Sequence, residues 1–139
     1  MNKQIIDMLT EVAKANDVPF PARVAAAVVH RNKLISVGMN KDKSHPMQKR
    51  FQSNKEAIFL HAEIDAIKNA IKKVDDVDFL QKCVVYIVRV KKNGKKGDWI
   101  WGMAKPCAGC MRCIEAFLLK GVVYTTDNQT IKEIDYDKI

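Results

Sequence analysis

Long apolar runs, repeats and export signals are missing from this sequence of 139 residues. No apolar stretch approaches the roughly 20 residues that a membrane-spanning helix needs. The first seven residues mix polar and apolar side chains and lack the apolar core of a signal peptide. There is no internal repeat, low-complexity segment or linker. We therefore expect one domain over residues 1–139, in the cytoplasm and away from membranes, where cysteines serve metal binding rather than disulfides.

Acidic residues are fewer than basic ones, and the formal net charge at pH 7 is +8. The excess lies in two polar stretches. Seven basic residues and one acid stand between Arg31 and Lys55, and four lysines fall within residues 91–96. This charge could be ordinary solvated loop surface. It could equally attract the phosphate of a nucleotide or polynucleotide.

Hydrophobic periodicity predicts alternating strands and helices. Helices are expected over residues 3–16, from near 61 onward, and over 108–120, with helical potential also near 54–60. Gly121 is expected to stop the helix over 108–120. Strands are expected at 23–30, 33–38, 83–90, 122–126 and 130–134, while 98–103 is compatible with extended structure. Such alternation favours an α/β sheet.

Two short motifs, His61-Ala62-Glu63 and Pro106-Cys107-Ala108-Gly109-Cys110, carry groups that suit zinc. One imidazole and two thiols make three ligands, and a catalytic zinc site usually leaves its fourth position to water. Residues two apart do not share a face in mid-helix, so His61 and Glu63 can converge only in a first helical turn. A helix N-terminus would also favour the thiolates of Cys107 and Cys110. The pattern H-x-E…P-C-x-x-C is the signature of zinc nucleobase deaminases.

The remaining cysteines and histidines have simpler interpretations. Cys113 is not expected to be a fourth ligand, because a closed site would leave no place for water. Cys83, in an apolar strand, is expected to be a buried small hydrophobe. His30 is expected to be structural, and His45 could contact substrate or a second metal.

With these motifs the chain resembles the cytidine and deoxycytidylate deaminase superfamily over nearly its whole length. The resemblance implies a three-layer α/β/α fold with a five-stranded mixed sheet. The turn at Asp127-Asn128 resembles the subgroup whose last two strands are antiparallel. Many members of the superfamily are dimers or tetramers, so the resemblance also implies a homo-oligomer.

The resemblance also assigns roles to individual residues. It implies Zn²⁺ held by His61, Cys107 and Cys110, and Glu63 as the group that moves protons during hydrolysis of the amine. The backbone N–H of Ala62 and the carbonyl near Lys105 would hold the edge of the base. Asn40 would contact the sugar, although after Gly38 it could simply be a turn residue.

The substrate stays open at this stage, because Ala104-Lys105 stands where related branches carry a leucine-glutamate or a tryptophan-serine pair. We expect deamination of cytosine in a free nucleoside or nucleotide, with deoxycytidylate leading because of the basic stretches. Single-stranded DNA or RNA is an alternative substrate, with Trp99, Trp101 or Phe51 stacking on bases; we take Trp101 as a substrate contact. A tryptophan beside a strand can also belong to the core. A non-catalytic zinc-stabilised nucleic-acid-binding domain is the second alternative, which Glu63 argues against.

Overall fold

The computed structural model describes residues 1–51, 59–94 and 97–136. Its strands are β1 (Arg23–His30), β2 (Lys33–Met39), β3 (Val84–Asn93), β4 (Asp98–Gly102), β5 (Gly121–Thr125) and β6 (Ile131–Asp135). Its helices are α1 (Lys3–Ala15), α2 (Pro46–Phe51), α3 (Ala62–Lys73), α4 (Ala108–Ala116) and the 3₁₀ helix η1 (Val77–Lys82). The helical potential predicted near 54–60 falls largely outside the described residues.

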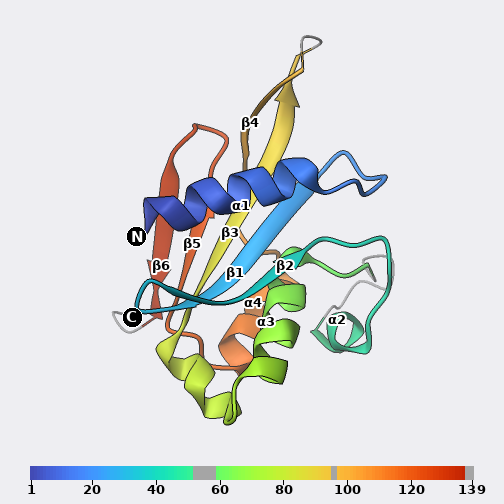
Figure 1. Cartoon of the computed structure of the whole chain (residues 1–139). Coiled ribbons are helices and arrows are strands. Elements are labelled where there is room, and N and C mark those ends of the chain that lie inside the picture. The colour runs from blue at the N-terminus through green and yellow to red at the C-terminus, as the bar shows by residue number, and fades with distance from the viewer. Residues whose placement is uncertain (52–58, 95–96, 137–139) are drawn as a thin grey trace.

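The strands form one mixed sheet in the order β2-β1-β3-β5-β6. Strand β3 is antiparallel to β1 and parallel to β5, and β5 is antiparallel to β6. The predicted mixed sheet and its antiparallel last two strands are therefore confirmed. The sixth strand, β4, pairs with the second half of β3, beyond the part that pairs with β5. Figure 1 shows the resulting β3–β4 hairpin projecting beyond the rest of the sheet.

Helices cover both faces of the sheet. Successive side chains of a strand point to opposite faces, so apolar residues on each face need a covering layer. Ala25 and Ala27 of β1 belong to the core beneath α1, whereas Ala26 and Val28 belong to the core shared with α3 and α4. In Figure 1, α1 lies across one face of the sheet. The three-layer α/β/α fold is confirmed. Among the described residues, no helix is both long and apolar enough to cross a membrane.

Helix α4 ends at Ala116, four residues before the predicted end at Lys120. The helix stops because Leu118 adopts a positive φ of 58° and the following amides turn back. The N–H of Leu119 donates to the Ile114 carbonyl at 3.2 Å, and that of Leu118 donates to the Glu115 carbonyl at 3.1 Å. This pattern is a Schellman C-terminus, which usually places glycine where Leu118 stands. The sequence prediction was wrong here because a leucine carries no helix-stop signal.

Gly121 has a different role from the predicted one. It lies in β5, where an added Cβ would come within 2.8 Å of the Ile134 carbonyl oxygen of β6. The glycine therefore allows β5 and β6 to approach each other and does not end the helix.

Candidate metal centre and active site

The start of α3 places the first motif. His61 is the N-cap residue, with φ −80° and ψ 156°, and Glu63 lies in the first turn. The expected first-turn arrangement of His61 and Glu63 is present. Helix α3 sits directly on β2 at Gly38, where an added Cβ would be 2.2 Å from the Ala66 nitrogen and 2.7 Å from the Ala62 oxygen. Any side chain at residue 38 would therefore push away the turn that carries His61 and Glu63.

A buried carboxylate ties the same turn to the end of β2. Asp65 is 1% exposed and accepts a hydrogen bond from the N–H of Met39 at 3.0 Å. Its charge is matched by Lys41 at 3.2 Å and Lys68 at 3.0 Å. A buried charge costs little only when it is paired and hydrogen-bonded. Asp65 therefore helps fix where α3 begins, a role that the sequence analysis missed.

The second motif meets the first at the start of α4. Cys107 is the N-cap residue of α4, and its sulfur accepts a hydrogen bond from the N–H of Cys110 at 3.5 Å. The Nδ1 atom of His61 lies 3.2 Å from Cys110 Sγ and 3.6 Å from Cys107 Sγ. The three ligand atoms all lie within 4.8 Å of one another. Two helix N-termini thus bring one nitrogen and two sulfurs together.

This spacing fits zinc. Zinc–sulfur bonds of about 2.3 Å and zinc–nitrogen bonds of about 2.0–2.1 Å, at tetrahedral angles, put ligand atoms about 3.5–3.8 Å apart. The two measured nitrogen–sulfur separations are close to this range. Within residues 1–51, 59–94 and 97–136, no other group of histidine, cysteine or acidic side chains has such spacing. Cys113 is not part of the group and is fully buried.

The electrostatics of the group also favour a cation. A hydrogen bond with Cys107, followed by burial, raises the pKa of the Cys110 thiol far above its ordinary value. The hydrogen bond with Cys107 raises the pKa of His61 as well. A bound divalent cation reverses this preference and stabilises the thiolates. Without a metal ion these groups hold their protons, and zinc would replace those protons when it binds.

Glu63 is only 6% exposed, and burial raises the pKa of its carboxyl. Burial disfavours the charged form, so the carboxyl gains affinity for a proton. A carboxyl with a raised pKa beside a set of metal ligands can accept a proton from water and release it again. The arrangement therefore supports acid–base chemistry next to the three ligands.

A cavity of about 230 Å³ opens above this group. Its lining brings together all the predicted site residues except Cys110, which is buried behind it, and Trp101. The lining residues that the sequence had predicted are Asn40, His61, Ala62, Glu63, Lys105 and Cys107, and the others include Ile87, Arg89, Met103 and Ala104.

The side chain of Asn40 is already held by protein groups. Its Oδ1 accepts from the N–H of Val24 at 2.9 Å and from Asn16 at 2.8 Å, and its Nδ2 donates to the Ala22 carbonyl at 2.9 Å. Asn40 therefore joins β1 to the end of α1 while it lines the cavity. Asn40 therefore has a structural role, although no turn is formed at this residue, and the contact with sugar stays a prediction.

Trp101 lies apart from the cavity. Its indole N–H donates to the hydroxyl of Thr10 on α1 at 3.1 Å, so the ring lies on the opposite face of the sheet. Trp99 packs against the same core, with Arg23 and Lys92 over its ring. Side chains alternate along a strand, and β4 presents both tryptophans to α1. The structure therefore does not place Trp101 where it could contact substrate in this cavity.

The other residues considered from the sequence have local partners. His30 packs edge-on against Phe79, with ring centroids 4.7 Å apart, in keeping with a structural role. The Nδ1 atom of His45 accepts from the N–H of Met47 at 3.1 Å. The ring of Phe51 lies 6.4 Å from that of Phe117 at the end of α4. None of the three lines the cavity described above.

Two polar residues at the site were missed by the sequence analysis. Gln48 of α2 is fully buried, and its Oε1 accepts from the N–H of His61 at 2.9 Å. Arg89 of β3 lines the cavity. Arg89 could have been noticed as a charge inside the apolar run over 83–90. Gln48 carried no signal, because it stands in a polar stretch where no helix was expected.

A three-layer α/β/α fold with a His–Cys–Cys group at two helix N-termini and a buried glutamate beside it is typical of the nucleobase deaminases. The sequence matches the family model of the cytidine and deoxycytidylate deaminase zinc-binding region over residues 1–126. The chain belongs to this family, and zinc is its cofactor. No curated protein matches the chain in sequence.

Solved structures of deaminases share the fold. A cytidine deaminase from Burkholderia pseudomallei superposes with a TM-score of 0.67 at 15% identity, covering 99% of this chain and 94% of that one. A dCMP deaminase from the cyanophage S-TIM5 gives a TM-score of 0.54 at 20% identity, covering 91% and 86%. The Thermotoga maritima diaminohydroxyphosphoribosylaminopyrimidine deaminase/5-amino-6-(5-phosphoribosylamino)uracil reductase gives 0.53 at 22% identity, covering 90% of this chain but 29% of that one.

Proposed function

We propose that this protein hydrolyses the amine of cytosine in a free nucleoside or nucleotide, leaving uracil and releasing ammonia. The observation that carries the proposal is the position of Glu63. The buried carboxyl lies in the first turn of α3, two residues after the predicted metal ligand His61, and lines the same cavity as Cys107. A purely structural zinc site has no need of such a carboxyl.

The residues predicted from the two motifs, together with Asn40 and Lys105, have distinct roles in this reaction. His61, Cys107 and Cys110 would hold zinc, which when bound makes water reactive at neutral pH. Water oxygen bonds to C4 of cytosine, and the bond from C4 to the amine nitrogen breaks. Glu63 takes one proton from water and passes it to ring N3. It then takes the second proton from the oxygen now bonded to C4 and gives it to the amine, so that the C4 carbonyl forms and ammonia leaves. The N–H of Ala62 and the carbonyl near Lys105 would orient the edge of the base, and Asn40 would contact the sugar.

A small substrate suits the described cavity better than a polynucleotide. The tryptophans that could have stacked on a strand face α1 instead. Of the hairpin lysines, Lys91 is paired with Asp127 at 2.7 Å and Lys92 lies over Trp99. The solved cyanophage dCMP deaminase was also determined in complex with dCMP and dUMP.

The test is mass spectrometry of the products from four substrates offered in parallel to the zinc-loaded protein. These are cytidine, deoxycytidine, deoxycytidylate and a cytosine-bearing single-stranded oligonucleotide. We expect a mass gain of about 1 Da, with ammonia release, on at least one of the three small compounds. Deamination of the oligonucleotide alone would support the polynucleotide alternative. No reaction with any of the four would leave the non-catalytic zinc domain as the better explanation.

A further inference from the structure

Arg89 is the one strongly basic side chain in the strand wall of the cavity. It stands on β3 opposite Val24 of β1. The N–H of Val24 is bonded to the side chain of Asn40, the predicted sugar contact, at 2.9 Å. Cross-strand neighbours have Cβ atoms about 4.5–5.5 Å apart. Arg89 therefore lies next to the part of the cavity where the sugar of a nucleoside is expected.

The guanidinium of Arg89 has unused hydrogen-bonding capacity. Its Nε atom is buried and has no hydrogen-bond partner among the residues that the structure describes. A buried donor without a partner costs about 1–3 kcal/mol, more when it is charged. Because this atom is enclosed by protein, the outer N–H groups of the guanidinium are the ones that could reach a ligand, on a side chain that lines the cavity.

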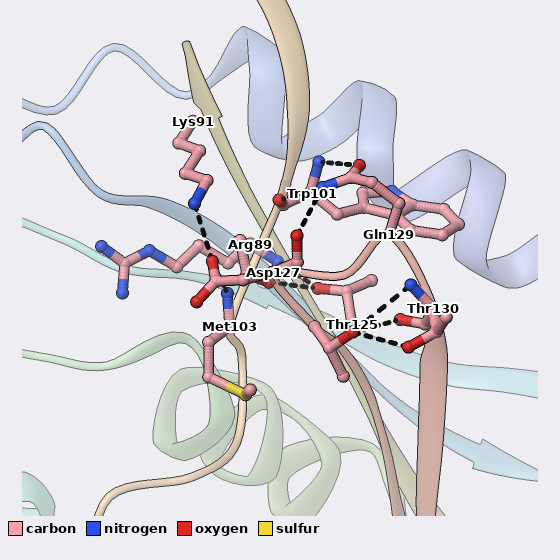
Figure 2. Close-up of polar contacts among 10 residues, drawn as sticks. Arg89, Lys91, Trp101, Met103, Thr125, Asp127, Gln129 and Thr130 are labelled. Carbon is pink, nitrogen blue, oxygen red and sulfur yellow. Dashed lines mark hydrogen bonds and ion pairs between the residues drawn. The ribbon is translucent and has the colours of Figure 1, made fainter. Parts of the chain in front are cut away.

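Gly102 and Thr125 contact the backbone and the aliphatic part of the Arg89 side chain and do not pair with its charge. Its cross-strand partner on β4 is Gly102, where an added Cβ would come within 3.2 Å of the Arg89 Cγ and Cδ atoms. The hydroxyl of Thr125 accepts from the Arg89 N–H at 3.2 Å and donates to the Gly102 carbonyl at 2.9 Å, which ties the two strands together. Thr125 is the last residue of β5 and is drawn together with Arg89 in Figure 2.

Asp127 is the acid beside Arg89, and its charge is already matched. Its Oδ1 atom is 2.7 Å from Lys91 Nζ and accepts from the N–H of Met103 at 3.2 Å (Figure 2). The hydrogen bond with Lys91 lowers the pKa of Asp127, with a smaller contribution from the charge of Arg89. The carboxylate is therefore ionised and bound to Lys91, and the guanidinium remains available for a second anion.

We infer that Arg89 binds the 5′-phosphate of the substrate, so that the protein prefers a cytosine nucleoside monophosphate to the nucleoside. The inference rests on the proposed function. Arginine forms short, charge-assisted and often bidentate hydrogen bonds to phosphate. Lys105 lines the same cavity, is exposed, and adds a second positive charge. The phosphate is remote from the reacting C4 atom, so Arg89 acts in specificity and not in the chemical step.

The test compares kcat/KM for deoxycytidylate and deoxycytidine in the zinc-loaded wild type and in Arg89→Gln and Arg89→Lys. A charged hydrogen bond is worth about 1.5–3 kcal/mol, so the ratio of the two kcat/KM values should fall about 10- to 100-fold in Arg89→Gln. Arg89→Lys keeps the positive charge but loses the planar guanidinium. Its ratio of kcat/KM values should lie between those of the wild type and Arg89→Gln. Calorimetry with the products, dUMP and deoxyuridine, should show the same change in the ratio of affinities.

Lys33→Gln is the matched control for net charge. Lys33 is exposed, begins β2 and pairs with His30, which lies about 20 Å along β1 from Val24. This variant should keep the wild-type ratio. If the wild type shows no preference for the monophosphate, or Arg89→Gln leaves the ratio unchanged, the inference is overturned while the proposed function stands. If the wild type deaminates no free cytosine nucleoside or nucleotide, with either ribose or deoxyribose, or deaminates only an oligonucleotide, both fail together.

Discussion

The backbone N–H of His61 donates to the side-chain Oε1 of Gln48 at 2.9 Å, and Gln48 is fully buried. This bond connects α2 to the residue that begins α3 and carries a metal ligand. A helix N-terminus leaves its first N–H groups without helical partners, and Gln48 satisfies the N–H of the N-cap residue itself. The position of the imidazole therefore depends on a side chain outside both sequence motifs.

Gln48→Leu should weaken zinc binding. The substitution leaves the buried N–H of His61 without an acceptor, which costs about 1–3 kcal/mol. Partners that orient metal ligands typically contribute about 10- to 100-fold to metal affinity, and we expect a loss of this size. Competition with a zinc-binding dye measures it. Gln81→Leu, at an exposed glutamine of η1, is the control and should bind zinc like the wild type. Equal affinities for the two variants would show that the Gln48 bond is incidental.

One zinc ion per chain is the expected metal content. Cys110→Ala and the double variant Cys107→Ala/Cys110→Ala should lose the ion together with part of the folding free energy, because metal binding is coupled to folding. Cys113→Ala should retain it, since Cys113 is not part of the ligand group. Elemental analysis of the purified proteins distinguishes the cases. Zinc retained by the double cysteine variant would contradict the ligand assignment.

Glu63→Ala separates chemistry from structure. The variant should keep the fold and zinc, yet lose deaminase activity by at least about 10²- to 10⁴-fold, because proton transfer is lost. Turnover, elemental analysis and circular dichroism together measure this. Removal of the neighbouring buried acid, in Asp65→Asn, should mainly lower stability, because it weakens the ion pairs with Lys41 and Lys68. Near-normal turnover in Glu63→Ala would remove Glu63 from the mechanism.

Gly38→Ala should destabilise the protein and displace the site. The added Cβ would meet the backbone of Ala66 at 2.2 Å, and backbone cannot move aside as a flexible side chain can. Overpacking of this kind costs about 1–3 kcal/mol or more. Urea unfolding measures the loss. Gly94→Ala is the control, because an added Cβ there meets open space and only the backbone strain of φ 68° remains. That strain costs about 1 kcal/mol, so the free energy of unfolding should fall less in Gly94→Ala than in Gly38→Ala.

The stability of the protein should fall above pH 9 partly through Cys113. Burial raises the pKa of its thiol from 9.0 to about 12. Between these values the unfolded chain releases the proton and the folded chain keeps it, so stability falls as pH rises. One proton corresponds to about 1.4 kcal/mol per pH unit. Between pH 9 and 12, Cys113→Ala should therefore lose stability less steeply than the wild type. Parallel slopes in chemical unfolding would show that Cys113 does not titrate in this way.

The choice of chemistry was readable in the sequence because it depends on local spacing. His61 and Glu63 two apart, and Cys107 and Cys110 three apart, can serve one metal only at helix N-termini, and both helices begin there. The positions of the strands along the chain were also predictable, because each strand is marked by its own apolar run. The antiparallel last pair, confirmed by β5 and β6, was predicted from the turn at Asp127-Asn128. One domain over residues 1–139, a cytoplasmic location and a homo-oligomer stay predictions.

What surrounds the site was decided only by tertiary structure. Which face of β4 meets α1 depends on the pairing of β3 and β4, and this register removed Trp101 from the cavity. The packing of α2 brought Gln48 to His61, 13 residues away, and β3 placed Arg89 beside the predicted sugar position. Motif residues are specified by short-range spacing, whereas these contacts arise from long-range packing, which no local pattern in the sequence encodes.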